Sequence, residues 1–424
     1  MSPSPRTSPA ESAPALQQEI AHLAATPKVA AAAEWFRSQE TQLTRWQLEL
    51  ARIPAPPFGE AARAAWVAAK FESLGLKNVH RDDVGNVLGL RSGAQDSAIS
   101  ISAHLDTVFP AGSVLNIRQQ GPRLYGPGIS DNAAGVTALL AIAAASQEFN
   151  LASDLSLLFI GDVGEEGEGD LRGMRHVFLD SQWKDVIRAS VVIDGAGTDT
   201  IVSEALGSRR FEIIIRGPGG HSWSDFGAPN PIVALAHAVH LFSQTRVAAS
   251  PKTTFNVGVI EGGTSVNSIP ECARMRVDIR SASAMEIERL EMELRRAVEQ
   301  GVESEDAHSH RGSSAHPHPA LKAEIHAIGN RPAGELAPNA RILQLARAVD
   351  AHLGNTARVQ RASTDANIPL SLGREAIAIG AGGTGGGAHT LQEWFDITGR
   401  ELALKRILLI VLALAGMPPS GAGR

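Results

Sequence analysis

The sequence has a single cysteine, no apolar run long enough for a membrane and no excess of one charge. One cysteine, Cys272, excludes an internal disulfide framework and fits a reducing compartment. The apolar run at 407–416 has about half the length that a spanning helix needs, so it predicts a buried helix. A net charge of −6, with acids and bases interspersed, favours neither nucleic acid nor an anionic membrane as a partner. We expect a cytoplasmic protein.

The length predicts more than one domain. At 424 residues, the chain exceeds the size at which single cores stop growing. Its content of 43% hydrophobic and 20% charged residues is that of a soluble globular protein. Residues 1–15 lack the apolar core of a signal peptide, and we expect a disordered tail there.

Residues 16–206 alternate between helical and strand-like patterns. The expected helices lie at 16–52, 59–76, 132–149 and 171–180, and the expected strands at 86–92, 98–103, 154–161 and 190–195. This alternation predicts an α/β domain with a mostly parallel sheet flanked by helices.

The pattern changes over 207–334. Strands are expected at 208–217, 253–262, 273–281 and 320–329, and helices at 230–244 and 283–300. This βαββαβ order predicts a small ferredoxin-like domain. Helix–strand alternation resumes over 335–424, so the small domain is inserted into the larger one. Four histidines in 304–320 allow metal scavenging, but the composition favours an exposed loop.

Five segments place a ligand-type residue where a strand or loop ends. They are SAHLD with His104, GPGISDNAAG with Asp131, GDVGEEGEG with Glu165 and Glu166, VVIDGAG with Asp194, and GGGAHT with His389. Taken singly, each has an ordinary explanation: an Asp before an apolar run caps a helix, and Asp-Gly is a common turn. The glycine-rich segment before His389 lacks the spacing of phosphate-binding loops.

Together these residues indicate a metal site. The carboxyl ends of strands in an open α/β sheet meet in one crevice, so distant loops converge there. Imidazoles and carboxylates without thiolates suit Zn, Mn or Co, and a shared carboxylate would hold two ions. We expect Asp106 to accept the other ring N–H of His104 and fix its tautomer. Since Glu165 and Glu166 are neighbours, one can bind metal while the other acts as general base.

Eight motifs between about residues 40 and 415 resemble one known family as a set. They are HLDTV, YGPGISDN, GEEGEGDLRG, VVIDG, GPGGHSW, SVNSIPECARMRVDIRS, STDANIPL and AHTLQEW. They are similar to the co-catalytic zinc exopeptidases and deacylases, which include peptidase T, carboxypeptidase G, acetylornithine deacetylase and aminoacylase. The resemblance is strongest to a peptidase T-like member.

The resemblance implies a role for each residue. The implied metal ligands are His104, Asp131, Glu166, Asp194 and His389, with Asp131 bridging two zinc ions and Glu165 as general base. The inserted domain would be a dimerisation domain, whose His221 reaches the active site of the other subunit of a homodimer. Asn267 and Arg280 match substrate-binding positions. The peptide bond between Asp131 and Asn132 would be cis.

Two departures from the family bear on the substrate. Many relatives carry Lys-Gly or Ala-Gly after the bridging aspartate, whereas this sequence reads DNAAG and supplies no cation there. Asp194 stands where several deacylases and carboxypeptidases have Glu, which favours a small-peptide exopeptidase. A deacylase or carboxypeptidase acting on N-acyl amino acids would use the same site and remains the alternative. A non-catalytic binding protein is disfavoured because Glu165 is present beside every implied ligand.

Overall fold

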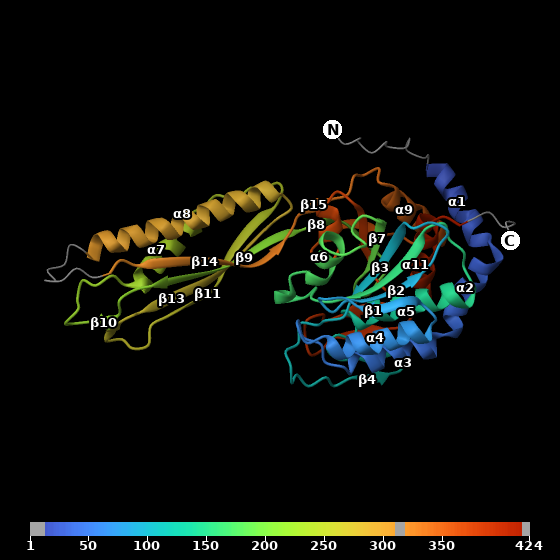
Figure 1. Ribbon diagram of the computed structural model, residues 1–424, viewed down its shortest axis with the longest axis horizontal. Helices are drawn as coiled ribbons and strands as arrows, with labels where there is room; N and C mark the ends of the chain where they lie inside the picture. Colours follow the sequence, from blue (N-terminus) through green and yellow to red (C-terminus); the bar gives the residue numbers. More distant parts are fainter. Residues whose placement is uncertain (1–12, 310–318, 418–424) are drawn as a thin grey trace. The chain divides into compact units, whose positions relative to one another are not determined.

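The computed structural model describes residues 13–309 and 319–417, and these form two compact units. The larger unit combines the chain up to Ala205 with the chain from Glu335 onward, and the smaller unit is Leu206–Gly334. Figure 1 shows the smaller unit, from β9 to β14, as a continuous insertion between two parts of the larger one.

A nine-stranded sheet forms the centre of the larger unit. Its order is β1 (Lys77–Arg81), β2 (Val87–Arg91), β6 (Ser156–Asp162), β3 (Ala98–His104), β7 (Ile187–Ile193), β17 (Glu375–Ile379), β8 (Thr200–Ala205) and β15 (Gly334–Glu335), and β16 (Arg358–Ala362) also pairs with β8. The central pairs β6–β3, β3–β7 and β7–β17 are parallel, as expected. The β1–β2 pair is antiparallel, because a short turn joins the two strands and a parallel pair does not permit one, and the β2–β6 pair is antiparallel as well. The sheet is therefore mixed.

Apolar residues cover both faces of this sheet, as its buried strands require. Leu157 and Phe159 of β6 face the larger core, whereas Leu158 and Ile160 face a smaller one. Helices of the larger core are α1 (Ala13–Ala25), α2 (Pro27–Ser38), α3 (Glu40–Ala51), α4 (Ala61–Ser73), α5 (Ala133–Glu148), α9 (Arg341–Leu353) and α11 (Arg400–Ala415). The smaller core is covered by α6 (Arg172–Leu179) and α10 (Asn367–Ser371). The apolar run at 407–416 lies mostly in α11 and is largely buried, as predicted.

The N-terminal segment differs from the expectation in two ways. Helix α1 begins at Ala13, so the last three residues of the predicted tail are helical, and Pro14 suits the first turn of a helix. Residues 1–12 of that tail lie outside the described residues. The helix expected over 16–52 is three helices: Thr26 before Pro27 takes an extended conformation that ends α1, and Gln39 lies outside helical geometry between α2 and α3. No helix in 13–309 or 319–417 is long and apolar enough to cross a membrane.

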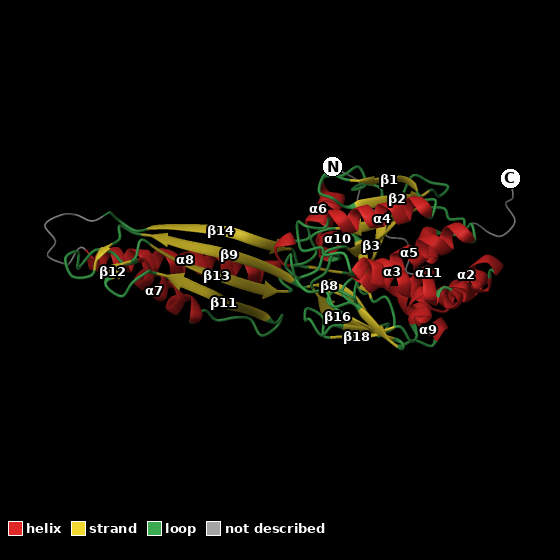
Figure 2. Cartoon of the chain, turned by 90° about the horizontal axis from the view of Figure 1, so that it is seen from below, coloured by secondary structure: helices red, strands yellow, loops and turns green. Residues whose placement is uncertain are grey.

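The smaller unit is the predicted βαββαβ fold. Its antiparallel sheet has the order β11 (Thr253–Gly262), β13 (Cys272–Ser281), β9 (Gly207–Arg216) and β14 (Lys322–Arg331). Helices α7 (Pro231–Ser243) and α8 (Ala284–Ser309) pack on one face of it (Figure 2). Alternate residues such as Phe211, Ile213 and Ile215 point into this core.

Helix α8 is longer than predicted. It continues to Ser309, so 304–309 of the histidine-rich segment are helical and the expected loop is wrong there. The reason is packing: Gly301 lies against the backbone of α7, which extends the buried side of α8 beyond residue 300. Residues 310–318, the centre of that segment, lie outside the described residues.

Candidate metal centre

The structure brings the five candidate ligands to one edge of the large sheet. His104 is the last residue of β3, Asp194 follows β7 directly, and Glu166 lies shortly after β6. Asp131 precedes α5, and His389 follows the short strand β18 (Thr384–Gly386). The parallel strands end at this edge, which is where an open α/β sheet forms its crevice.

Asp131 lies between the two imidazoles. Its Oδ1 is 3.1 Å from Nε2 of His104, and its Oδ2 is 3.1 Å from Nε2 of His389. Oε1 of Glu166 is 3.0 Å from the same nitrogen of His389, and Oδ1 of Asp194 is 3.7 Å from Nε2 of His104. The peptide bond between Asp131 and Asn132 is cis, as the resemblance implies.

Two groups of donor atoms therefore share Asp131. His104, Asp131 and Asp194 form one, and Asp131, Glu166 and His389 form the other, with the donor atoms of each within 4.8 Å of one another. Each group offers one imidazole, one carboxylate of its own and the shared carboxylate. Nitrogen and oxygen donors of this kind suit divalent ions such as zinc or manganese, so the residues fit a pair of such ions.

The pKa values of His104, His389 and Glu166 are all raised, so the cluster attracts positive charge. Burial lowers the pKa of His104, but the neighbouring carboxylates of Asp106, Asp131 and Asp194 outweigh it and raise that pKa well above its usual range. The hydrogen bond with Asp131 and the charges of Asp131 and Glu166 raise the pKa of His389 to about 9. Burial, helped by the charge of Asp131, raises the pKa of Glu166 to about 7. The raised pKa values mean that positive charge on this cluster is favourable, which is also what binding of a cation requires.

Asp106 has a different main contact from the one expected. Its carboxylate lies 3.6 Å from Nδ1 of His104, longer than a hydrogen bond, and that nitrogen lies 3.2 Å from the backbone oxygen of Asp106. The carboxylate instead accepts backbone N–H bonds from Gly164 and Glu165 at Oδ1 and from Glu166 at Oδ2, at 2.8–3.0 Å. The side chain therefore fixes the loop that carries both glutamates.

The two neighbouring glutamates are both buried. Glu166 contacts His389 directly, and the donor atoms of Glu165 and Glu166 lie within 4.8 Å of a ring nitrogen of His104. Glu165 is thus at the cluster but outside the two groups that share Asp131.

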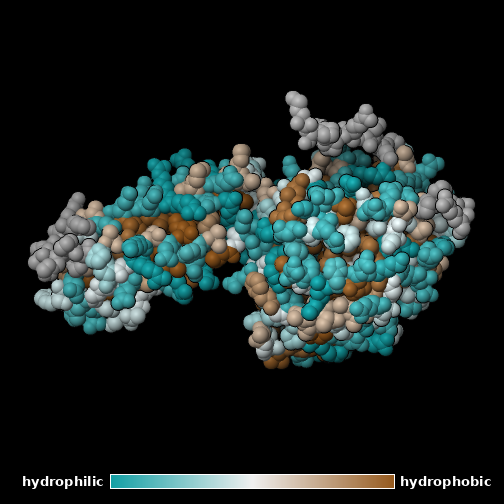
Figure 3. Space-filling view, viewed as in Figure 1, coloured by the Kyte–Doolittle hydropathy of each residue, from teal (hydrophilic) through white to brown (hydrophobic). Residues whose placement is uncertain are grey.

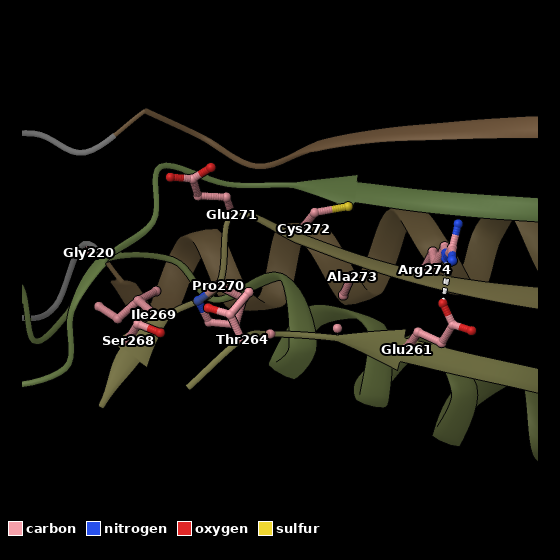
Figure 4. Close-up of a pocket in the computed structure, with 12 residues that line it drawn as sticks. Gly220, Glu261, Thr264, Ser268, Ile269, Pro270, Glu271, Cys272, Ala273 and Arg274 are labelled. Carbon is pink, nitrogen blue, oxygen red and sulfur yellow. Dashed lines mark hydrogen bonds and ion pairs between the residues drawn. The ribbon is translucent and has the colours of Figure 1, made fainter. Parts of the chain in front are cut away.

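His221 and Asn267 lie side by side in the smaller unit. Strand β10 (Gly220–His221) pairs with β12 (Ser268–Ile269), and the N–H of Ser222 donates to the oxygen of Asn267 at 3.0 Å. A cavity of about 730 Å³ adjoins this pair, with Gly220, Ser268 and Cys272 in its wall (Figure 4). Arg280 is not brought to them. It lies near the other end of β13, roughly 26 Å of strand beyond Cys272, and its guanidinium binds Asp278 at 2.7 Å.

Sequence reasoning missed three side chains behind the site. The buried carboxylate of Glu393 accepts N–H bonds from Gly128, Ser130 and Asp131 at 2.7–2.8 Å. Asn132 bonds to the backbone of Ile193 and Gly195, next to Asp194. Arg63 is fully buried. Glu393 lies in AHTLQEW, four residues after His389, and Asn132 ends YGPGISDN, so both stood in quoted motifs, whereas Arg63 had no such signal.

A second buried acidic pair lies beneath His104. Asp162 and Asp365 are fully buried, and their carboxyl groups interact with each other. Burial raises the pKa of Asp162 to about 6, and burial with the charge of Asp162 raises the pKa of Asp365 well above its usual range.

Two family models match the chain in succession. Residues 86–209 match peptidase family M28, and residues 204–306 match the peptidase dimerisation domain. A "probable carboxypeptidase" of Aspergillus clavatus is 30% identical over 57% of this chain and 58% of its own length. Another, of Aspergillus flavus, is 32% identical over 47% of this chain and 50% of its own. The chain thus spans about half the length of the curated relatives it matches.

Solved structures confirm the fold across most of the chain. The aminopeptidase PepT of Bacillus cereus superposes with a TM-score of 0.69 at 20% identity, covering 89% of this chain and 99% of that one. A tripeptidase of Staphylococcus aureus gives 0.70 at 20% identity, covering 89% and 98%. The chain therefore has the fold of these solved peptidases, with one segment that matches peptidase family M28 and one that matches the peptidase dimerisation domain. The resemblance to the exopeptidase and deacylase family is therefore confirmed.

Proposed function

We propose that this protein is a metal-dependent hydrolase that cleaves the amide bonds of small peptides, as a di- or tripeptide exopeptidase. The observation that carries the proposal is Asp131, held between His104 and His389 with one further carboxylate on either side and Glu165 adjoining. The peptidase segments matched in sequence support the same reaction.

The ligands would be His104, Asp131, Glu166, Asp194 and His389, binding two divalent ions. Zinc suits these donors best, and manganese or cobalt would also fit. When bound, the ions supply Lewis acidity and lower the pKa of a water molecule.

Glu165 provides the proton transfer. It lies beside the ligand cluster, and its backbone N–H is fixed by Asp106. From there it accepts the proton of the attacking water and delivers it to the leaving amine, as a general base and then a general acid. The burial of Glu165 keeps bulk water from competing for that proton.

We further propose that the protein works as a homodimer through the smaller unit. Strand β11 is the edge of its sheet and carries the exposed Val259 and Ile260, and Gly262 of the same strand contacts Ile232 of α7. An exposed apolar edge is suited to pair with a second copy. Figure 3 shows apolar surface along the smaller unit. The match to a peptidase dimerisation domain supports this occupant.

A dimer also explains how His221 and Arg280 could serve one substrate. His221 lies in the two-stranded sheet of β10 and β12, whereas Arg280 lies near the far end of β13 in the four-stranded sheet, so one small substrate would contact both if they come from different copies. In this arrangement His221 of one copy donates to the oxyanion that develops in the other copy's site, and Asn267 and Arg280 bind the substrate. A single cysteine supports a cytoplasmic location.

A deacylase or carboxypeptidase of N-acyl amino acids is the second candidate. It is favoured by the curated relatives, which are described as carboxypeptidases. Its chemistry would use the same ligands and base with a different pocket.

A substrate panel tests the proposal. Protein loaded with zinc, manganese or cobalt is assayed on free-amine di- and tripeptides and on N-acetyl amino acids with the same side chains. Hydrolysis of the free-amine peptides at least tenfold faster supports the exopeptidase, and the reverse order supports the second candidate. Glu165→Gln is the control for contaminating peptidases. No hydrolysis of either class by metal-loaded protein rejects both.

A further inference from the structure

Three ligand-bearing loops are each held by one buried side chain. The carboxylate of Asp106 accepts hydrogen bonds from the backbone N–H groups of residues 164–166, the loop that carries Glu166. Glu393 accepts those of Gly128, Ser130 and Asp131. Asn132 joins α5 to the loop of Asp194: it accepts from the N–H of Gly195 and donates to the oxygen of Ile193. The loops are therefore connected to the fold by contacts that involve no metal.

Glu393 connects two ligands at once. It lies four residues after His389, and its backbone oxygen accepts the N–H of Gly126 while its carboxylate binds the next turn of the same loop. One of its three carboxylate bonds goes to the N–H of Asp131 itself. A shift of Glu393 would thus move Asp131 relative to His389, the pair that stands 3.1 Å apart.

Arg63 supplies the charge that two buried carboxylates need. It is 1% exposed, and it donates to the backbone oxygens of Leu105 and Ile53 at 2.9 and 2.8 Å. Leu105 directly precedes Asp106, so the bond to Leu105 places the guanidinium beside the segment that carries the Asp106 carboxylate, and the charges of Asp106 and Glu393 both act on it. Asp106 and Glu393 are each 0% exposed, and a buried anion is unfavourable unless a cation or hydrogen-bond donors compensate for the lost water.

We propose that Glu393, Asp106 and Arg63 form a buried positioning set that fixes the two ligand loops, 128–131 and 164–166, before any metal binds. Glu393 and Asp106 each hold one loop, and Arg63 stabilises both. None of the three is a ligand. The proposal rests on the ligand assignment of the proposed function, but not on which amide is cleaved.

The positioning set predicts opposite patterns of amide hydrogen exchange for the two carboxylate variants of the metal-free protein. In Glu393→Gln an NH₂ group replaces one acceptor oxygen, so amide hydrogen exchange should speed up at least tenfold in 126–133 and stay unchanged in 163–168. Asp106→Asn should do the reverse. Arg63→Met should speed up exchange in both segments. Because supporting residues of metal ligands change affinity by about 10–100-fold, Glu393→Gln and Asp106→Asn should each weaken zinc binding by that factor.

The matched control is Glu375→Gln. Glu375 also accepts two backbone N–H bonds, from Arg341 and Ile342 at the start of α9, both at 3.0 Å. The same chemical change there should leave exchange in both loops and zinc affinity unaltered. If Glu393→Gln does not fold, Glu393→Asp retains the charge but retracts it by one methylene, and faster exchange confined to 126–133 supports the proposal equally.

Hydrogen exchange by mass spectrometry and zinc titration decide the matter without substrate. Equal acceleration in both loops by Glu393→Gln, or zinc affinity within twofold of the wild type, would overturn the positioning set. A protein that passes both measurements but hydrolyses nothing would refute the proposed function and leave the positioning set intact.

Discussion

The two units handle charge in opposite ways. The larger unit buries charged side chains, among them Arg63, Asp106, Asp162 and Glu393, and most lie behind the edge where the parallel strands end. The smaller unit carries its cross-strand ion pairs at the surface, for example Arg276 with Glu212 at 3.0 Å. Buried charge is costly unless it is paired, so its concentration at one sheet edge marks that edge as functional. In the smaller unit, by contrast, His221 and Asn267, for which we propose a role, are exposed.

The largest effect should come from the two adjacent glutamates of the larger unit. Glu165→Gln should lower kcat by about a thousandfold or more, because the proton acceptor is lost, while two metals remain bound. Glu166→Gln should instead lose metal, since its carboxylate contacts His389. Metal analysis of both purified variants, beside kcat, makes the comparison. If Glu165→Gln loses metal and Glu166→Gln retains it, Glu165 is the ligand and Glu166 is the general base.

The next effect tests what the smaller unit contributes. His221→Ala should lower kcat by about 10²–10³-fold if its imidazole stabilises the oxyanion. A heterodimer of one His221→Ala chain and one Glu165→Gln chain should recover near half of wild-type activity, because one site then has both groups. Differently tagged chains allow this heterodimer to be purified and assayed. Activity no higher than that of the two homodimers would place His221 in the site of its own chain.

A smaller effect is expected for the pH dependence of zinc affinity, which concerns only the larger unit. In the metal-free protein the pKa of His389 is raised to about 9 from its ordinary value of 6.5. Its stabilising contribution is therefore complete below pH 6.5 and is lost as pH rises through 9. Metal binding displaces this proton, so its loss should raise zinc affinity by about tenfold from pH 7 to 8 and by a smaller factor from pH 8 to 9. Titration calorimetry in buffers of different ionisation enthalpy would detect the released protons, and a pH-independent affinity would contradict the assignment of His389.

The smallest effect is expected for an exposed ion pair. Arg276→Ala removes the partner of Glu212 and should change stability by about 0.5 kcal/mol or less. The matched change in the larger unit is Arg406→Ala. It leaves the buried Asp350 without its cationic partner and should lower the free energy of unfolding by about 3–5 kcal/mol. Calorimetry that resolves the two unfolding transitions would compare them. Similar costs would mean that the two units do not differ in how they use charge.

Much of the fold was predictable because strands and helices have distinct apolar periods. The strand at 253–262 matches β11 at both ends, and the βαββαβ order is correct. The antiparallel partners of β2 and the full length of α8 were not predictable, because they depend on packing between distant segments. Local sequence carries no record of such contacts.

The candidate site also contains residues that the sequence predicts and residues that it does not. The five ligand-type residues were identifiable because each ends a strand or loop, and the topology brings such ends together. Arg63 lies within the helical pattern of α4, where an arginine is ordinarily a surface residue. Asn132 and Glu393 act on backbone N–H and C=O groups, which every sequence contains. Their roles arise only when the chain is folded.

The insertion of the smaller unit also sets an order of synthesis. Its first strand, β9, pairs with its last, β14, and Ser208 lies opposite Arg331, so the chain leaves and re-enters the larger unit at adjacent points. Every residue of the smaller unit is translated before β17 and α11, which complete the sheet and the main core of the larger unit. On the ribosome, the inserted unit can therefore finish folding while its host is still missing a central strand and the segment that carries His389.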